Sequence, residues 1–167
     1  MQFLSSKAVL YLRIIGLTAL LFFLLKSPTS IFNANFSLLL GQAMRLPTVT
    51  VSNENPLLGL VALFVFGVAL SDLVPLMAEN TQHFETLVPV RLGFFFFLAI
   101  FCMISEYGPI ANNIVFTYSF LEIWVNFVLF TNLRDEKYKR AREFLEKHGD
   151  EMREMANERV RPINDDE

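Results

Sequence analysis

The chain has 167 residues, 53% of them hydrophobic and 18 of them phenylalanine, and its formal net charge at pH 7 is −3. This composition is too apolar for an ordinary soluble domain and predicts a membrane protein. The lack of a basic excess argues against a nucleic-acid-binding role. The single cysteine, Cys102, excludes an intrachain disulfide and a cysteine-based metal site.

Four apolar segments have the length of roughly 20 residues that is needed to cross a bilayer. They cover residues 8–25, 57–77, 87–104 and 114–133. We expect all four to be helical, because a helix satisfies its own backbone hydrogen bonds in lipid and four short segments cannot close a barrel. The sequence therefore predicts an all-α fold whose membrane domain, residues 1–133, is a four-helix bundle.

The first segment has two interpretations, a retained helix or a cleaved signal peptide. It follows a short N-terminal region with Lys7, as the core of a signal peptide does. However, its apolar run is interrupted only by Arg13 and is longer than a typical signal-peptide core, and Lys26-Ser27-Pro28-Thr29 is a poor cleavage context. These features favour a retained helix.

The first connector is long, and residues 31–46 place apolar side chains at helical spacing. We expect an amphipathic helix here that lies along the membrane surface and ends before Pro47. The sequence Asn35-Phe36-Ser37 makes Asn35 a candidate for N-glycosylation. The other connectors are short, which predicts antiparallel neighbours, and we expect Asn112 and Asn113 to be solvated in the third.

Charged residues are concentrated in residues 134–167, which hold nine of the 14 basic and 11 of the 17 acidic side chains. A 3-4 spacing of apolar residues from Tyr138 to Met155 predicts that the fourth helix continues into this tail, with Gly149 as a candidate break point. The tail helix is either a solvated helix or a docking stripe for a partner.

Positive charge near the ends of the apolar segments predicts the orientation. Five basic residues lie between Arg134 and Arg142, whereas the first connector has only Lys26 and Arg45 and the third has none. Positively charged connectors are retained on the cytosolic side. We therefore expect a cytosolic C-terminal helix and, with four spans, a cytosolic N-terminus.

Within the apolar segments we single out five residues that are costly in hydrocarbon, all in the half expected to face the cytosol: Arg13, Asp72, Arg91, Glu122 and Asn126. Ionisable groups at such depth normally face the bundle interior and find a partner. Asp72 and Arg91 lie at similar depth across a short hairpin, which predicts an ion pair. Glu122 and Asn126 share a helix face at i, i+4, and Arg13 can extend to Glu122 or outward to the interface.

Two interpretations of this polar cluster remain open. In the first, the pairs fix which helices are neighbours, with Gly67 and Ser71 allowing close backbone approach. In the second, the same groups line a cavity for a proton, an ion or a polar headgroup. No catalytic motif, phosphate-binding loop or metal-ligand spacing is recognisable. We therefore expect no enzyme activity, no metal and no cofactor.

Several short strings occur in a fixed order along the chain. They are Gly41-Gln42-Ala43-Met44-Arg45-Leu46-Pro47, Asp72-Leu73-Val74-Pro75-Leu76, Val88-Pro89-Val90-Arg91-Leu92, Asn112-Asn113-Ile114-Val115-Phe116, Glu122-Ile123-Trp124-Val125-Asn126-Phe127 and Arg134-Asp135-Glu136-Lys137. Over residues 7–137 the chain resembles the fungal "increased loss of mitochondrial DNA" protein family. The resemblance implies a multi-pass protein of the endoplasmic reticulum membrane whose loss impairs mitochondrial genome maintenance. It implies no reaction, ligand or catalytic residue.

Together these features predict a non-enzymatic membrane protein that supports mitochondrial DNA maintenance indirectly. It would act through membrane homeostasis or a membrane-protein partner, in contact with membrane lipids and without binding nucleic acid. The alternative is a small carrier or transporter accessory subunit that uses the polar cluster in the cytosolic half of the bundle.

Overall fold

The computed structural model describes residues 5–105 and 107–160, with side chains up to residue 149. This part of the chain is all-α and contains no strand. Its helices are α1 (Ser6–Lys26), α2 (Pro28–Phe32), α3 (Asn35–Ala43), α4 (Leu57–Met77), α5 (Thr81–Ile104) and α6 (Asn113–Val160). The chain forms two compact units that divide between Asn132 and Leu133.

Four helices are long and apolar enough to cross a membrane: α1, α4, α5 and the first part of α6. Their outward faces are strongly apolar, with Phe64 and Phe97 each 68% exposed and Ile104 78% exposed. Soluble monomers rarely expose such large apolar surfaces. The fold is therefore compatible with a protein surrounded by lipid.

Local signals in the sequence set where these helices begin and end. Ser27 interrupts the helical backbone after α1, and Pro28 then opens α2 at a position where its missing N–H is harmless. Asn80 accepts a hydrogen bond from the His83 N–H at the start of α5 (3.2 Å). Asn112 caps α6 by accepting from the N–H groups of Ile114 (3.1 Å) and Val115 (3.0 Å).

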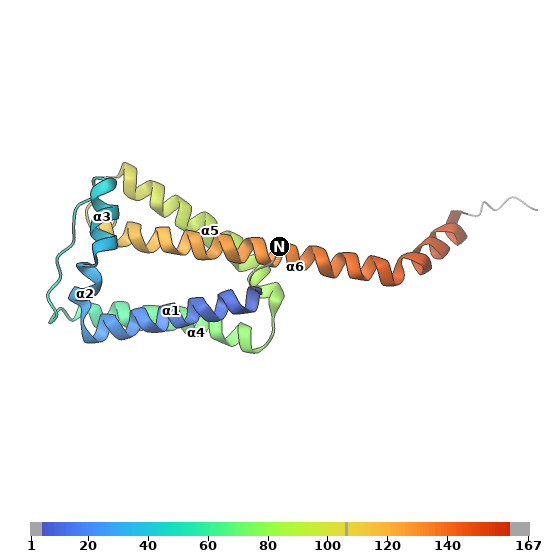
Figure 1. Cartoon of the computed structure of the whole chain (residues 1–167), viewed down its shortest axis with the longest axis horizontal. Helices are drawn as coiled ribbons and strands as arrows, with labels where there is room; N and C mark the ends of the chain where they lie inside the picture. The colour runs from blue at the N-terminus through green and yellow to red at the C-terminus, as the bar shows by residue number, and fades with distance from the viewer. Residues whose placement is uncertain (1–4, 106, 161–167) are drawn as a thin grey trace, which may run out of the picture. The chain divides into compact units, whose positions relative to one another are not determined.

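Within the unit that ends at Asn132, the long helices run lengthwise and α2 and α3 lie across one end of the bundle (Figure 1). Helix α1 packs along α4, while Phe95 of α5 meets Tyr118 of α6 edge to face, with ring centroids 5.7 Å apart. A small apolar core of Leu24, Leu58 and Ala62 lies where α1 and α4 approach α2.

The connector expected to form one amphipathic helix over residues 31–46 instead forms α2 and α3, separated at Asn33 and Ala34. Helix α3 ends at Ala43, before Pro47, because the chain turns at Arg45, whose φ is 56°. Its Phe36 and Leu39 side chains are exposed (51% and 66%), while Ser37 and Gly41 are buried. The fully buried positions of α3 are thus occupied by two small residues.

Two further expectations differ from the structure. Helix α6 continues to Val160 without a break at Gly149. Gly67 has open space where a Cβ would lie, and Ser71 is exposed and donates to the Val68 carbonyl of its own helix (2.9 Å). Gly67 and Ser71 therefore lie on the outer face of α4. The helix is rotated so that Asp72 faces the inside of the bundle.

Candidate functional site

Arg13 connects three helices through a buried guanidinium group. Its side chain is 4% exposed and pairs with Asp72 of α4 through Nη1. On the other side it contacts the Glu122 carboxylate of α6, with Nη2 3.1 Å from Oε1 and Nε 3.3 Å from Oε2. This fork-like contact matches the geometry by which arginine recognises a carboxylate.

Arg91 brings the fourth long helix into the same network. Its Nη1 lies 2.7 Å from Oδ1 of Asp72, so the Asp72 carboxylate is shared by arginines from α1 and α5. The Asp72 side chain is fully buried, whereas that of Arg91 is 17% exposed. Arg91 is therefore the most exposed of the four charged side chains in the network.

Glu122 receives further hydrogen bonds from its own helix. The Tyr118 hydroxyl donates to Oε1 (2.9 Å), and Asn126 Nδ2 donates to Oε2 (2.8 Å) and to the Glu122 backbone carbonyl (2.8 Å). Asn126 is fully buried, and its Oδ1 accepts no hydrogen bond from the described residues. The Asp72 oxygens contact arginine nitrogens in ion pairs, whereas Asn126 Oδ1 has no hydrogen-bond donor among the described residues.

The two arginines and two carboxylates balance in formal charge. Removing one member of a buried pair leaves an uncompensated charge, which is costly in a medium of low dielectric constant. Each of the four groups contacts an opposite charge on another helix. The arrangement can therefore hold α1, α4, α5 and α6 in a fixed set of neighbours.

The sequence anticipated much of this cluster. The expected Asp72–Arg91 ion pair is present, and Glu122 and Asn126 share a face and hydrogen bond directly. Of the two outcomes considered for Arg13, the side chain reaches Glu122. Its contact with Asp72 was not anticipated, nor was the role of Tyr118, although Tyr118 lies four residues before Glu122 and thus on its face.

A second buried polar cluster ties the first connector to the start of α6. Asn113 is fully buried: its N–H donates to the Pro47 carbonyl (3.1 Å), its Oδ1 accepts from the Val49 N–H (3.0 Å), and its Nδ2 donates to Ser37 Oγ (3.3 Å). Thr117 Oγ1 also lies 3.3 Å from Ser37 Oγ. The expectation that Asn112 and Asn113 are solvated is therefore wrong, because both cap or bind backbone groups that packing has buried.

Asn35, the candidate for N-glycosylation, is exposed at the first position of α3. Ser37, the third residue of the same sequence motif, is only 3% exposed, and its hydroxyl is held by Asn113 and Thr117. The motif is thus partly used in packing. Its modification stays a prediction.

Among the described residues, no three or more His, Cys, Asp or Glu side chains are grouped so that they could hold a metal ion. Cys102 is buried and donates through Sγ to the Ile110 carbonyl (3.4 Å). The buried charged side chains among the described residues are Arg13, Asp72 and Glu122, and each is engaged with another side chain of the same network.

Comparison with known proteins places this sequence in a family. The family model described as "Increased loss of mitochondrial DNA protein 1" (Ilm1) matches residues 4–143. The chain belongs to the Ilm1 family. The curated "Protein ILM1" of Saccharomyces cerevisiae is 38% identical over 148 residues, which cover 86% of this chain and 73% of that protein. No solved structure matches the chain.

The family match spans every residue of the polar cluster, from Arg13 to Asn126, and the first turns of the tail helix. The family description links its members to the loss of mitochondrial DNA. This member of the Ilm1 family therefore has a helical bundle with four apolar helices and a network of buried ion pairs between them.

Proposed function

We propose that this Ilm1-family protein is a non-enzymatic, multi-pass protein of the endoplasmic reticulum membrane that supports mitochondrial DNA maintenance indirectly. It does so through membrane homeostasis or through a membrane-protein partner. The observation that carries the proposal is the buried network of Arg13, Asp72, Arg91 and Glu122, in which every charged group is paired between helices.

The pairing supports a structural role for the network. Ionisable groups inside a membrane are expensive and are retained where they bind something or hold helices together. Here the arginines and carboxylates are matched in number and contact one another. A carboxylate that already accepts from Arg13, Tyr118 and Asn126 is poorly placed to act as a general base.

The charge distribution supports the topology and the indirect action. Five basic residues follow the fourth apolar segment between Arg134 and Arg142, which favours a cytosolic tail. The net charge of −3 means that the chain as a whole has no basic excess, which argues against DNA binding. A membrane protein of this kind would influence the mitochondrial genome without touching it.

The location is tested with a tagged full-length chain expressed in cells that lack the native protein. We expect it to restore mitochondrial DNA retention, resist extraction by alkaline carbonate, and fractionate with the endoplasmic reticulum. A tag after Glu167 should be digested by protease added to sealed microsomes. Fractionation with the mitochondrial inner membrane would refute the indirect mechanism, and a protected tag would refute the orientation.

A carrier or transporter accessory subunit is the second candidate. It is favoured by Asn126 Oδ1, a buried acceptor without a donor among the described residues, and by the partial exposure of Arg91. Polar groups left unsatisfied in a buried site mark places where a ligand or water can bind.

The two candidates differ in what Glu122→Gln should do. If the cluster is structural, this substitution lowers both protein abundance and mitochondrial DNA retention, because Arg13 loses one of its two carboxylate partners. If the cluster binds a ligand, retention falls while abundance is unchanged. Tyr118→Phe is the matched control, since it removes one hydrogen bond to Glu122 and leaves its charge.

A further inference from the structure

Beyond residue 133, helix α6 has two chemically different faces. At about 100° per residue, one face is formed by Arg134, Lys137, Tyr138, Ala141, Arg142, Phe144, Leu145 and His148. It has three Lys or Arg side chains and no acidic one. The opposite face is formed by Asp135, Glu136, Lys139, Arg140, Glu143, Glu146 and Lys147, which include all four acidic residues of positions 134–149.

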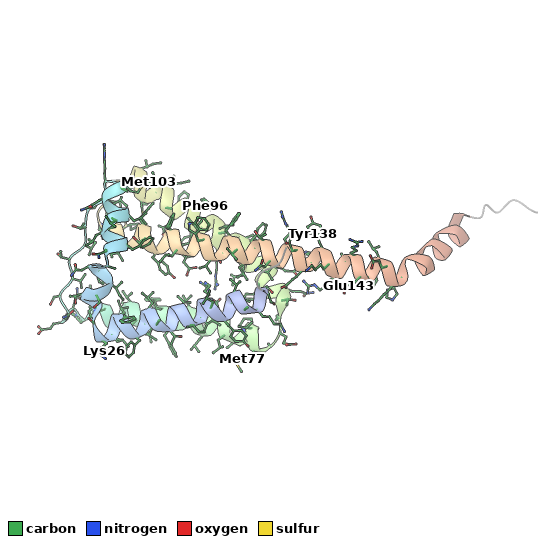
Figure 2. All side chains as sticks on the ribbon, in the orientation of Figure 1. Lys26, Met77, Phe96, Met103, Tyr138 and Glu143 are labelled. Carbon is green, nitrogen blue, oxygen red and sulfur yellow. The ribbon has the colours of Figure 1, made fainter. Side chains whose placement is uncertain are left out.

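The apolar side chains of the first face, which we call the basic-aromatic face, are exposed. Tyr138 is 69% exposed, Leu145 58% and Phe144 56%, and the Phe144 ring stacks on the His148 imidazole with centroids 4.6 Å apart. Figure 2 shows Tyr138 and Glu143 on different sides of this helix. Large apolar groups beside cations, with acids segregated behind them, are typical of a helix that binds a membrane surface.

The cations of this face are also exposed to solvent. Arg134, Lys137 and Arg142 are all exposed. Arg142 Nε lies 2.9 Å from Glu146 Oε1, but both side chains are mostly in solvent, where such an i, i+4 pair is weak. The face therefore presents its positive charge at the solvent-exposed surface.

We infer that the basic-aromatic face binds anionic phospholipid headgroups of the leaflet from which α6 emerges. Basic clusters directly beside a spanning helix are attracted to anionic leaflets, and tyrosine rings favour the headgroup layer. Ala141 lies roughly 12 Å along the helix from Leu133, so a tilt that is ordinary for spanning helices brings this turn close to the headgroups. The inference rests on the proposed function, since it requires α6 to cross the membrane.

The test uses the full-length chain in nanodiscs, with Cys102→Ser to leave one labelling site. An environment-sensitive dye is attached at Ala141→Cys on the basic-aromatic face or at Glu143→Cys on the opposite face. In discs of phosphatidylcholine with phosphatidylserine we expect the emission at position 141 to shift to the blue relative to phosphatidylcholine alone. High salt should reverse the shift, and position 143 should not respond.

Two double variants separate the face from net charge alone. Lys137→Gln with Arg142→Gln and Lys139→Gln with Arg140→Gln each remove one lysine and one arginine, but from opposite faces. The first should abolish the shift at position 141, and the second should leave most of it. Equal loss in both would overturn the assignment to one face.

The lipid assignment has its own contrary outcomes. The lipid assignment would be overturned if the dye emission at position 141 did not shift in discs with phosphatidylserine, or if it shifted equally in phosphatidylcholine alone. It would also be overturned if the emission shifted only after an acidic protein was added. A chain that carbonate extracts from membranes refutes the proposed function. A chain that stays in the membrane but shows no lipid-dependent shift refutes only this inference.

Discussion

Arg13 illustrates how one side chain can determine the neighbours of a helix. It contacts Asp72 and Glu122 from two other helices, and Asp72 in turn contacts Arg91. Inside the bilayer that the proposed function requires, no water shell is available, so each of these charges depends on the others for solvation. The energetic consequence of changing one of them should therefore depend on which others remain.

Asp72→Ala should be strongly destabilising, because it leaves Arg13 with one carboxylate partner and removes the contact of Arg91. We expect a loss of about 3–5 kcal/mol in the free energy of unfolding, measured in detergent, and lower abundance in cells. In a cycle with Arg91→Ala, the coupling energy should be about 0.5–3 kcal/mol. Strictly additive losses would contradict the pair.

An exposed ion pair joins the start of α1 to the α4–α5 connector. Lys7 Nζ lies 2.7 Å from Glu79 Oε1, and this hydrogen bond, together with the lysine charge, lowers the pKa of Glu79 below its usual value of 4.5. A depressed carboxyl pKa means that the stabilisation is present above that usual value and is lost as the pH falls through the lowered pKa.

The Lys7–Glu79 pair predicts a titration result. Lys7→Gln should bring the pKa of Glu79 back toward its usual value, as measured by NMR titration of the carboxyl group in detergent. The global stability should change little, because the pair is exposed. Lys26→Gln, at the other end of α1, is the control and should leave the pKa of Glu79 in place.

At the scale of elements, the contact between α3 and α6 decides how the first connector sits on the bundle. A Cβ at Gly41 would lie 2.6 Å from Cβ of Asn113. Asn113 cannot retreat easily, since it binds Pro47, Val49 and Ser37. Glycine at position 41 is thus required by the close approach of two helices.

Gly41→Ala should destabilise the protein by about 1–3 kcal/mol, although alanine is the better helix former. Thermal unfolding in detergent measures the effect. Gly67→Ala is the matched control, because nothing lies within 4 Å of its added Cβ, and its unfolding temperature should be unchanged or slightly higher. An unchanged unfolding temperature for Gly41→Ala would contradict the packing of α3 on α6.

At the scale of the whole molecule, the chain divides between Asn132 and Leu133 into a unit with the polar clusters and a unit that contains the rest of α6. The contacts of the first unit described above involve no residue beyond Asn132. The family match ends at residue 143. The last part of the chain should therefore contribute little to the stability of the first unit.

Truncation after Gly149 should leave the thermal unfolding temperature in detergent unchanged, since it removes none of the buried pairs. The same truncated chain should support mitochondrial DNA retention as the full chain does, if the proposed function is correct. The Asp72→Ala variant of the truncated chain should lose the same stability as it does in the full chain. A lower unfolding temperature on truncation alone would show that the tail supports the bundle.

The sequence alone determined the four long helices and the presence of a polar cluster. The length and apolar composition of a segment, and its need to satisfy its backbone hydrogen bonds, are local properties. They predict a long helix for each of the four apolar segments in lipid. The spacing of Glu122 and Asn126 and the matched depths of Asp72 and Arg91 are likewise read along one helix or one hairpin.

Only the tertiary structure decided which faces meet. How each helix is rotated about its axis decides which residues are buried and which are exposed. It decides that Arg13 contacts the carboxylates of Asp72 and Glu122, that Asn113 is buried, and that Gly41 faces the bundle while Gly67 faces outward. In lipid, apolar side chains fit almost any rotation, because the surrounding tails are as apolar as they are. A few polar contacts between residues far apart in the sequence therefore fix the rotation, and a linear pattern does not contain their partners.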